Sequence, residues 1–244
     1  QLVAKLYQND DAHVAPLLRH PAGVIALSDA GAHLIYFCDA GYGLHFLAQA
    51  TEEAPGIMLG FYESPARLIQ KAKNMGLDLE GPVASGAVEL IWCPPSENVV
   101  DELISDLLDR TMVKGAKRVF IDGITALRDS LIVSERLPFI LNALNRRLAA
   151  AGVTAFYTSE IRDMHLPECL PSDEVSLIVD NVVVLTYSRQ EDALRRNLSI
   201  VKLRDSDFDP RAKEFHVGRG GIVFGPDPQL TRNGVGGHAA HTPG

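Results

Sequence analysis

The feature that most constrains the fold is a regular alternation of short apolar runs and amphipathic stretches between about Leu44 and Tyr187. The apolar runs predict strands at residues 55–64, 86–92, 117–123, 153–160 and 176–187. Apolar residues at helical spacing predict helices at residues 64–79, 96–116 and 134–152. Strands that alternate with helices predict an α/β fold with a mainly parallel sheet and right-handed crossovers. Because the runs are continuously apolar, the strands are expected to be buried on both faces.

Residues at the helix ends support this segmentation. Ser64 is a candidate N-cap and Pro65 a candidate first helical residue, while Gly76 is expected to end that helix. Gly115 is expected to end the second helix, and Pro138 lies early in the third.

The pattern changes after Tyr187. Residues 189–196 are predicted to form a charged turn, and residues 197–204 and 214–225 to form antiparallel strands at the sheet edge. Residues 226–244 are rich in glycine, proline and small side chains and are expected to be a flexible tail. The expected fold is therefore a mainly parallel sheet flanked by helices, with a C-terminal antiparallel edge hairpin.

Bulk composition excludes some functions. The 244 residues carry a net charge of −8 without a long Lys/Arg run, so no nucleic-acid footprint is visible. No apolar run reaches the roughly 18–20 residues of a membrane span. The odd number of cysteines (Cys38, Cys93 and Cys169) argues against a disulfide framework and favours a cytoplasmic location.

Polar residues follow three of the predicted parallel strands, where ligands bind in open α/β sheets. Glu63, Asp122, and Thr158 with Ser159 hold these positions. A carboxylate there can hold Mg²⁺, and a second one can orient an attacking water molecule. The alternative is that these acids cap the following helix or turn.

Lys202 and Arg204 are two residues apart on a predicted strand, so they are expected to share a face. Two cations on one face can reach a phosphate. The alternative is a solvated face of an edge strand, where lysine is common because it prevents edge-to-edge aggregation.

Five stretches together resemble one known family. They are "GLHFLAQATEEAPGIMLGFYESPARLIQKAKNMGLDL", "RVFIDGITALRDS", "AFYTSEI", "DNVVVLTY" and "LSIVKLRDSDFDPRAKEF". Their order and separations resemble the KaiC-like branch of the RecA-type P-loop ATPases, over about Leu44 to Gly225. The resemblance implies ATP and Mg²⁺ as ligands and a homo-oligomeric ring, a hexamer in relatives.

The resemblance also implies residue roles. Asp122 matches the Walker B aspartate that helps to hold Mg²⁺. Glu63 matches the second of two adjacent glutamates and is the expected catalytic base. Tyr62 replaces the first glutamate, and a phenol is a poor base at pH 7. Thr158 and Ser159 match the strand end near the γ-phosphate.

The cation pair has an implied role as well. Lys202 and Arg204 match a "KLR" pair that in relatives reaches the nucleotide of the adjacent subunit.

One part of the family pattern is missing. The chain contains no G-K-[ST], the end of the Walker A motif whose backbone N–H groups, lysine and hydroxyl hold the phosphates and Mg²⁺. "FCDAGYG" stands at the expected place, with Asp39 where the lysine belongs, and a carboxylate repels a triphosphate. Nucleotide binding is therefore expected to be impaired.

Residues 1–43 have a different resemblance. "LLRHPAGVIALSDAGAHLIYFCDAGY" resembles a piece of the N-acyl-D-amino-acid deacylases, zinc enzymes of the amidohydrolase family, in which Asp29 matches the aspartate that helps to activate the metal-bound water. His33 and Asp39 lie nearby, but the chain has no H-x-H pair and no further barrel strands. The changeover between the two pieces is expected near residues 41–44. We expect the apolar "GVIAL" to pair into the RecA-type sheet near the place of the missing phosphate-loop strand.

The sequence is compatible with three functions. The first is a KaiC-like ATP-binding domain with a signalling or regulatory role, impaired by the missing motif. The second is a nucleotide-independent assembly module, and the third is a fragment of a zinc-dependent deacylase.

Overall fold

The computed structural model describes residues 24–28, 54–94, 99–160, 178–190, 193–204, 207–209, 211–218 and 221–224. In chain order its elements are β1 (Val24–Ser28), β2 (Gly56–Gly60), α4 (Pro65–Asn74), α5 (Glu80–Ala84), β3 (Val88–Trp92), α6 (Val100–Lys114), β4 (Arg118–Asp122), α7 (Ile124–Asp129), the 3₁₀ helix η2 (Ser134–Arg136), α8 (Leu137–Ala150), β5 (Thr154–Glu160), β6 (Asn181–Gln190), β7 (Ala193–Leu203), β8 (Lys213–Gly218) and β9 (Gly221–Phe224).

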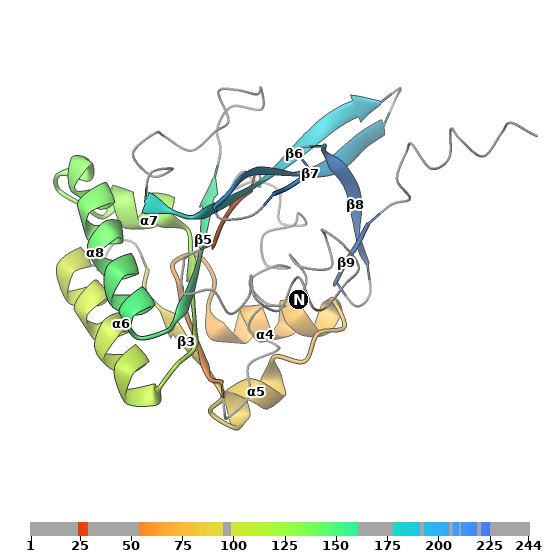
Figure 1. Cartoon of the computed structure of the whole chain (residues 1–244). Coiled ribbons are helices and arrows are strands. Elements are labelled where there is room, and N and C mark those ends of the chain that lie inside the picture. Colours follow the sequence, from red (N-terminus) through yellow and green to blue (C-terminus); the bar gives the residue numbers. More distant parts are fainter. Residues whose placement is uncertain are drawn as a thin grey trace, which may run out of the picture.

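The strands of the described ranges form one sheet in the order β3-β2-β4-β5-β1-β6-β7-β8-β9. Neighbours from β3 to β6 pair in parallel, and β7, β8 and β9 continue the sheet in antiparallel pairs. The prediction of a mainly parallel sheet with an antiparallel edge is confirmed (Figure 1). None of the helices in these ranges combines the length and apolarity needed to cross a membrane.

Strand β1 lies inside the parallel part of the sheet. Val24 of β1 is in register with Phe156 of β5 on one side and with Asn181 of β6 on the other. The expectation that this apolar segment pairs into the RecA-type sheet is therefore confirmed.

Both faces of the parallel strands are buried, as the continuous apolar runs predict. In β4, Val119 and Ile121 pack against α6, α7 and α8, whereas Phe120 packs on the opposite face with Leu68 and Ala72 of α4. Figure 1 shows α6 and α8 on one side of the sheet and α4 and α5 on the other. The carboxyl edge of the sheet is thereby fixed between two packed layers.

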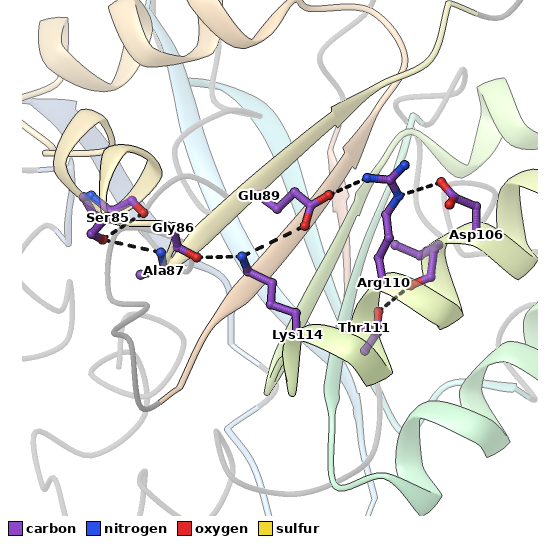
Figure 2. Close-up of polar contacts among 10 residues, drawn as sticks. Ser85, Gly86, Ala87, Glu89, Asp106, Arg110, Thr111 and Lys114 are labelled. Atoms are coloured by element: carbon purple, nitrogen blue, oxygen red, sulfur yellow. Dashed lines mark hydrogen bonds and ion pairs between the residues drawn. The ribbon is translucent and has the colours of Figure 1, made fainter.

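The exposed edge strand β3 is protected by charged side chains of α6 (Figure 2). Arg110 pairs with Glu89 of β3 through Nη1 and with Asp106 through Nε, both at 2.7 Å. The Lys114 ammonium donates to the Gly86 carbonyl oxygen at 2.6 Å. Charges along an edge strand discourage pairing with another sheet.

Some predicted boundaries were wrong. Residues 189–196 are not a charged turn, because β6 extends to Gln190 and β7 begins at Ala193. Polar side chains of the long β6–β7 hairpin form hydrogen bonds across its strands, as the Asn197 amide does to the Ser188 hydroxyl at 2.7 Å. Such cross-strand bonds allow a polar sequence to form strands where its composition predicted a turn. The short helices α5 and α7 were not predicted. Both are too brief to show a periodic pattern.

Candidate functional site

A carboxylate and a hydroxyl meet at the ends of the adjacent strands β4 and β5. The Thr158 hydroxyl donates to Oδ1 of Asp122 at 2.7 Å and accepts the Gly123 N–H at 2.8 Å. Thr158 is buried, and Asp122 is partly buried. The parallel register brings these two side chains together, because the residues just before them, Ile121 and Tyr157, are partners in the pairing of β4 with β5.

Burial raises the pKa of Asp122 above its ordinary value. The hydrogen bond from Thr158 opposes this shift, the charge of Glu63 adds to it, and the charge of Lys71 opposes it. Even a partly buried carboxylate is costly without a full counter-charge, so the site favours a cation beside Asp122.

Glu63 follows β2 and is held by helix α4. Its Oε1 contacts the Lys71 ammonium and lies 3.6 Å from Nε of Arg67. The carboxylate expected to act as a base is therefore engaged by two cations. Of these contacts, only the spacing of four residues between Glu63 and Arg67 was visible in the sequence.

Two aromatic side chains border the site. An added Cβ on Gly123 would lie 3.0 Å from Cε2 of Tyr62, so the Tyr62 ring covers the residue after Asp122. The Trp92 indole N–H donates to the Phe61 carbonyl oxygen at 3.2 Å. Tyr62 thus packs over the backbone that follows Asp122.

The two nucleotide-binding candidates on β5, Thr158 and Ser159, lie on opposite faces of the sheet. Phe156 packs on the α4 side of the sheet and Tyr157 on the α6 side. Since successive strand residues alternate between faces, Thr158 lies on the α4 side and Ser159 on the other. The structure brings Thr158, but not Ser159, to Asp122.

Lys202 and Arg204 bind the segment that precedes β6. The Lys202 ammonium donates to the Val179 carbonyl oxygen at 2.6 Å, and Nη1 of Arg204 lies 2.7 Å from Oδ1 of Asp180. Burial lowers the pKa of Lys202, the positive charge of Arg204 lowers it further, and the charge of Asp180 opposes the shift. The role of Asp180 had no signal in the sequence.

The cation pair is far from Asp122 within one chain. Lys202 on β7 is in register with Val182 of β6, and β1 and β5 lie between β6 and β4. Four strand spacings of about 4.8 Å give a separation of about 19 Å. In the same chain, therefore, these cations do not lie directly beside Asp122.

The residues fit Mg²⁺ better than they fit a triphosphate. Asp122 and Thr158 offer the oxygen donors that Mg²⁺ prefers. In the described ranges, no three His, Cys, Asp or Glu side chains form a group able to hold a metal, so phosphate and water oxygens would have to complete the shell. For a triphosphate, the sequence contains no G-K-[ST], the motif end that binds phosphates.

Several sequence predictions lie outside the described residues. These are the deacylase-like Asp29, His33 and Asp39, and the predicted tail at residues 226–244.

The family follows from a match along most of the chain. Residues 41–229 match the family model described as "ATPase: KaiC". The chain belongs to the KaiC ATPase family. The circadian clock oscillator protein KaiC of Parasynechococcus marenigrum (strain WH8102) is 31% identical over 198 residues, which cover 76% of this chain and 38% of the relative. The circadian clock protein KaiC2 of Synechocystis sp. is 26% identical over 202 residues, covering 79% and 35%.

A solved structure shows the same fold. A KaiC-like protein from the hyperthermophilic archaeon Pyrococcus horikoshii OT3 superposes with a TM-score of 0.70 at 22% identity, covering 85% of this chain and 90% of that one. The chain spans little more than a third of the length of the two curated relatives. What those longer proteins do as a whole therefore does not transfer directly.

Proposed function

We propose that this chain is a KaiC-type regulatory or signalling domain that keeps the metal side of the ATPase site and binds Mg-ATP weakly. The observation that carries the proposal is the Asp122–Thr158 hydrogen bond of 2.7 Å at the ends of β4 and β5. A pre-oriented carboxylate oxygen suits Mg²⁺. The lack of a G-K-[ST] removes the lysine that would reach the β- and γ-phosphates. The regulatory role is extended from relatives that are named circadian clock proteins.

Each site residue has a part in this proposal. Asp122 holds Mg²⁺, and the Thr158 hydroxyl keeps the Asp122 carboxylate oriented. Ser159 is the next residue along β5. Glu63 is the remaining carboxylate able to orient water, but its contacts with Lys71 and Arg67 lower its capacity as a base. We therefore expect slow hydrolysis even where nucleotide is bound.

Lys202 and Arg204 act on the neighbouring subunit of a homo-oligomeric ring in this proposal. Their backbone lies four strand spacings, about 19 Å, from that of Asp122, which favours a role at another subunit's site. In the isolated chain they are held by Val179 and Asp180, so ring formation must release them before they reach a nucleotide.

Mg-ATP titration tests the proposal directly. Calorimetry and the fluorescence of Trp92, the chain's one tryptophan, are expected to show no saturation below about 1 mM Mg-ATP, a binding free energy weaker than about −4 kcal/mol. Asp122→Ala is the matched control, because any signal that persists in it does not come from this site. Micromolar binding by the parent chain that Asp122→Ala abolishes would show that another part of the chain replaces the missing lysine.

A nucleotide-independent assembly module is the second candidate, favoured by an exposed apolar patch. We define this patch as Val99, Ile132, Val133 and Phe139, which are 58%, 103%, 49% and 77% exposed. The ion pair of 2.9 Å between Arg136 and Asp101 holds the segment before α8 against the start of α6, where Val99 lies. Exposed apolar side chains grouped in this way are typical of interaction surfaces.

The assembly candidate predicts oligomers without nucleotide. Light scattering after size-exclusion chromatography is expected to give a multimeric mass, and Phe139→Ser with Ile132→Ser is expected to shift it toward the monomer. Val113→Ser is the control, because Val113 is 91% exposed but lies near the opposite end of α6. A monomeric parent chain in the absence of nucleotide would rule this candidate out.

A further inference from the structure

One short segment before β6 contacts both cations at the end of β7. The Lys202 ammonium donates to the Val179 carbonyl oxygen, and the guanidinium of Arg204 lies against the Asp180 carboxylate. The backbone N–H of Arg204 also donates to the Asp180 carbonyl oxygen at 3.1 Å. The antiparallel pairing of β6 with β7 places the end of β7 opposite this segment. The two cations are therefore neighbours, and Asp180 is the carboxylate that one of them contacts.

The side-chain contact between Arg204 and Asp180 is weak for an ion pair. The Arg204 side chain is 51% exposed and that of Asp180 is 22% exposed. Within the described ranges, no hydrogen bond from the guanidinium accompanies their contact of 2.7 Å. Arg136, in contrast, donates from both Nη atoms to the two carboxylate oxygens of Asp101, at 3.2 and 2.9 Å. Exposed ion pairs contribute little to stability, so another anion can replace Asp180 at a small cost.

A phosphate group suits the two cations better than one carboxylate does. A guanidinium presents a planar fork of N–H donors that matches two phosphate oxygens, and a lysine ammonium adds a point charge. Lys202 and Arg204 also carry like charges close together, and a phosphate group with two negative charges compensates both. The single charge of Asp180 compensates only one of them.

We propose that Asp180 is an intramolecular competitor for phosphate, whose carboxylate occupies Arg204 until a phosphate group displaces it. The inference rests on the proposed role of Lys202 and Arg204 at a nucleotide, and it adds a regulatory residue to that role. Asp180 raises the phosphate concentration at which the cation pair is filled. The pair therefore responds to a phosphate group presented at high local concentration and ignores dilute phosphate in solution.

A purely structural tie between β6 and β7 is the alternative. In that case Asp180 fixes the end of β7, and its removal lowers stability without changing how the chain binds anions. A competitor has the opposite signature, because its removal increases the affinity for phosphate groups. The affinity for an anion thus separates the two explanations, whereas stability alone does not.

Calorimetric titration with sodium pyrophosphate, in chelator and without nucleotide, tests the inference. Asp180→Asn keeps the size of the side chain and the backbone carbonyl that accepts from Arg204. This variant is expected to bind pyrophosphate about fivefold more tightly than the parent chain, the factor that corresponds to the loss of an exposed ion pair. Asp180→Ser removes the carboxylate with a smaller side chain and is expected to give the same gain. Sodium chloride at equal ionic strength corrects for screening.

Two further variants show where the pyrophosphate binds. Asp101→Asn is the matched control, because it also removes a carboxylate from an arginine, and it is expected to leave the affinity unchanged. Adding Arg204→Gln to Asp180→Asn is expected to abolish the gain. The inference is overturned if neither Asp180 variant exceeds the parent chain, if Asp101→Asn gains as much, or if the gain survives Arg204→Gln. Because the titration contains no Mg²⁺ and no ATP, micromolar Mg-ATP binding would defeat the proposed function and leave this result standing.

Discussion

Replacing Gly123 by alanine is expected to destabilise the domain by about 2–3 kcal/mol. Gly123 has φ of 98° and ψ of 73°, a conformation that L-residues rarely adopt. A left-handed residue with a Cβ costs about 1–2 kcal/mol. The added Cβ would also lie 3.0 Å from the Tyr62 ring, which would have to move. Chemical denaturation of the two proteins measures the difference.

The two contributions can be separated with variants of the same chain. Gly152→Ala is the control for backbone strain alone, because Gly152 has φ of 67° and open space around its Cβ position, and a loss of about 1 kcal/mol is expected there. Tyr62→Ala in the Gly123→Ala background is expected to recover the part due to the ring. Equal losses at Gly123 and Gly152 would show that the Tyr62 contact has no energetic effect.

The same substitution bears on the site. The Gly123 N–H donates to the Thr158 hydroxyl that in turn donates to Asp122. A shift of the peptide to relieve strain therefore disturbs the orientation of the carboxylate. Gly123 is therefore needed both for its left-handed backbone conformation and for the N–H that supports the Thr158–Asp122 contact. No pattern in the sequence indicates that a glycine is needed at this position.

The parallel core was predictable because its signals are local. Apolar runs such as Val119–Ile121 are continuous in the sequence, and Gly115 ends α6 with φ of 64°, as a C-terminal glycine should. Asp122 and Thr158 follow such runs directly, so their meeting follows from parallel pairing of β4 and β5. Local pattern and parallel topology were sufficient for this part of the site.

The remaining contacts depend on tertiary distances that no sequence pattern encodes. Lys71 reaches Glu63 only because α4 packs back on the sheet, and Asp180 meets Arg204 only because β7 returns antiparallel beside β6. The resemblance placed both Thr158 and Ser159 at the strand end near the γ-phosphate, and in the structure it is Thr158 that bonds to Asp122. Adjacent strand residues lie on opposite faces, and the resemblance to relatives did not state which face holds the ligand.

Replacing Asn145 by leucine is expected to lower stability by about 2–3 kcal/mol. The hydroxyl of Tyr157, a buried residue of β5, donates to Oδ1 of Asn145 on α8. Burial raises the pKa of Tyr157, so the hydroxyl keeps its proton and needs an acceptor across the usual pH range. Leucine leaves that donor in apolar surroundings and also removes the bond of 3.4 Å from Asn145 Nδ2 to the Ile178 carbonyl oxygen. Urea denaturation measures the loss.

Tyr157→Phe is the matched control, and its expected loss is only about 1 kcal/mol because the partly exposed Asn145 amide can bind water instead. The double variant is expected to lose less than the sum of the single losses, by about 1 kcal/mol. Strict additivity would contradict the argument. The result matters beyond stability, because Tyr157 directly precedes Thr158, and Ile178 directly precedes the residue whose carbonyl holds Lys202. Asn145 therefore joins β5, the strand that carries Thr158, to the segment before β6 that binds Lys202 and Arg204, and its loss is expected to loosen both of these contacts in the middle of the sheet.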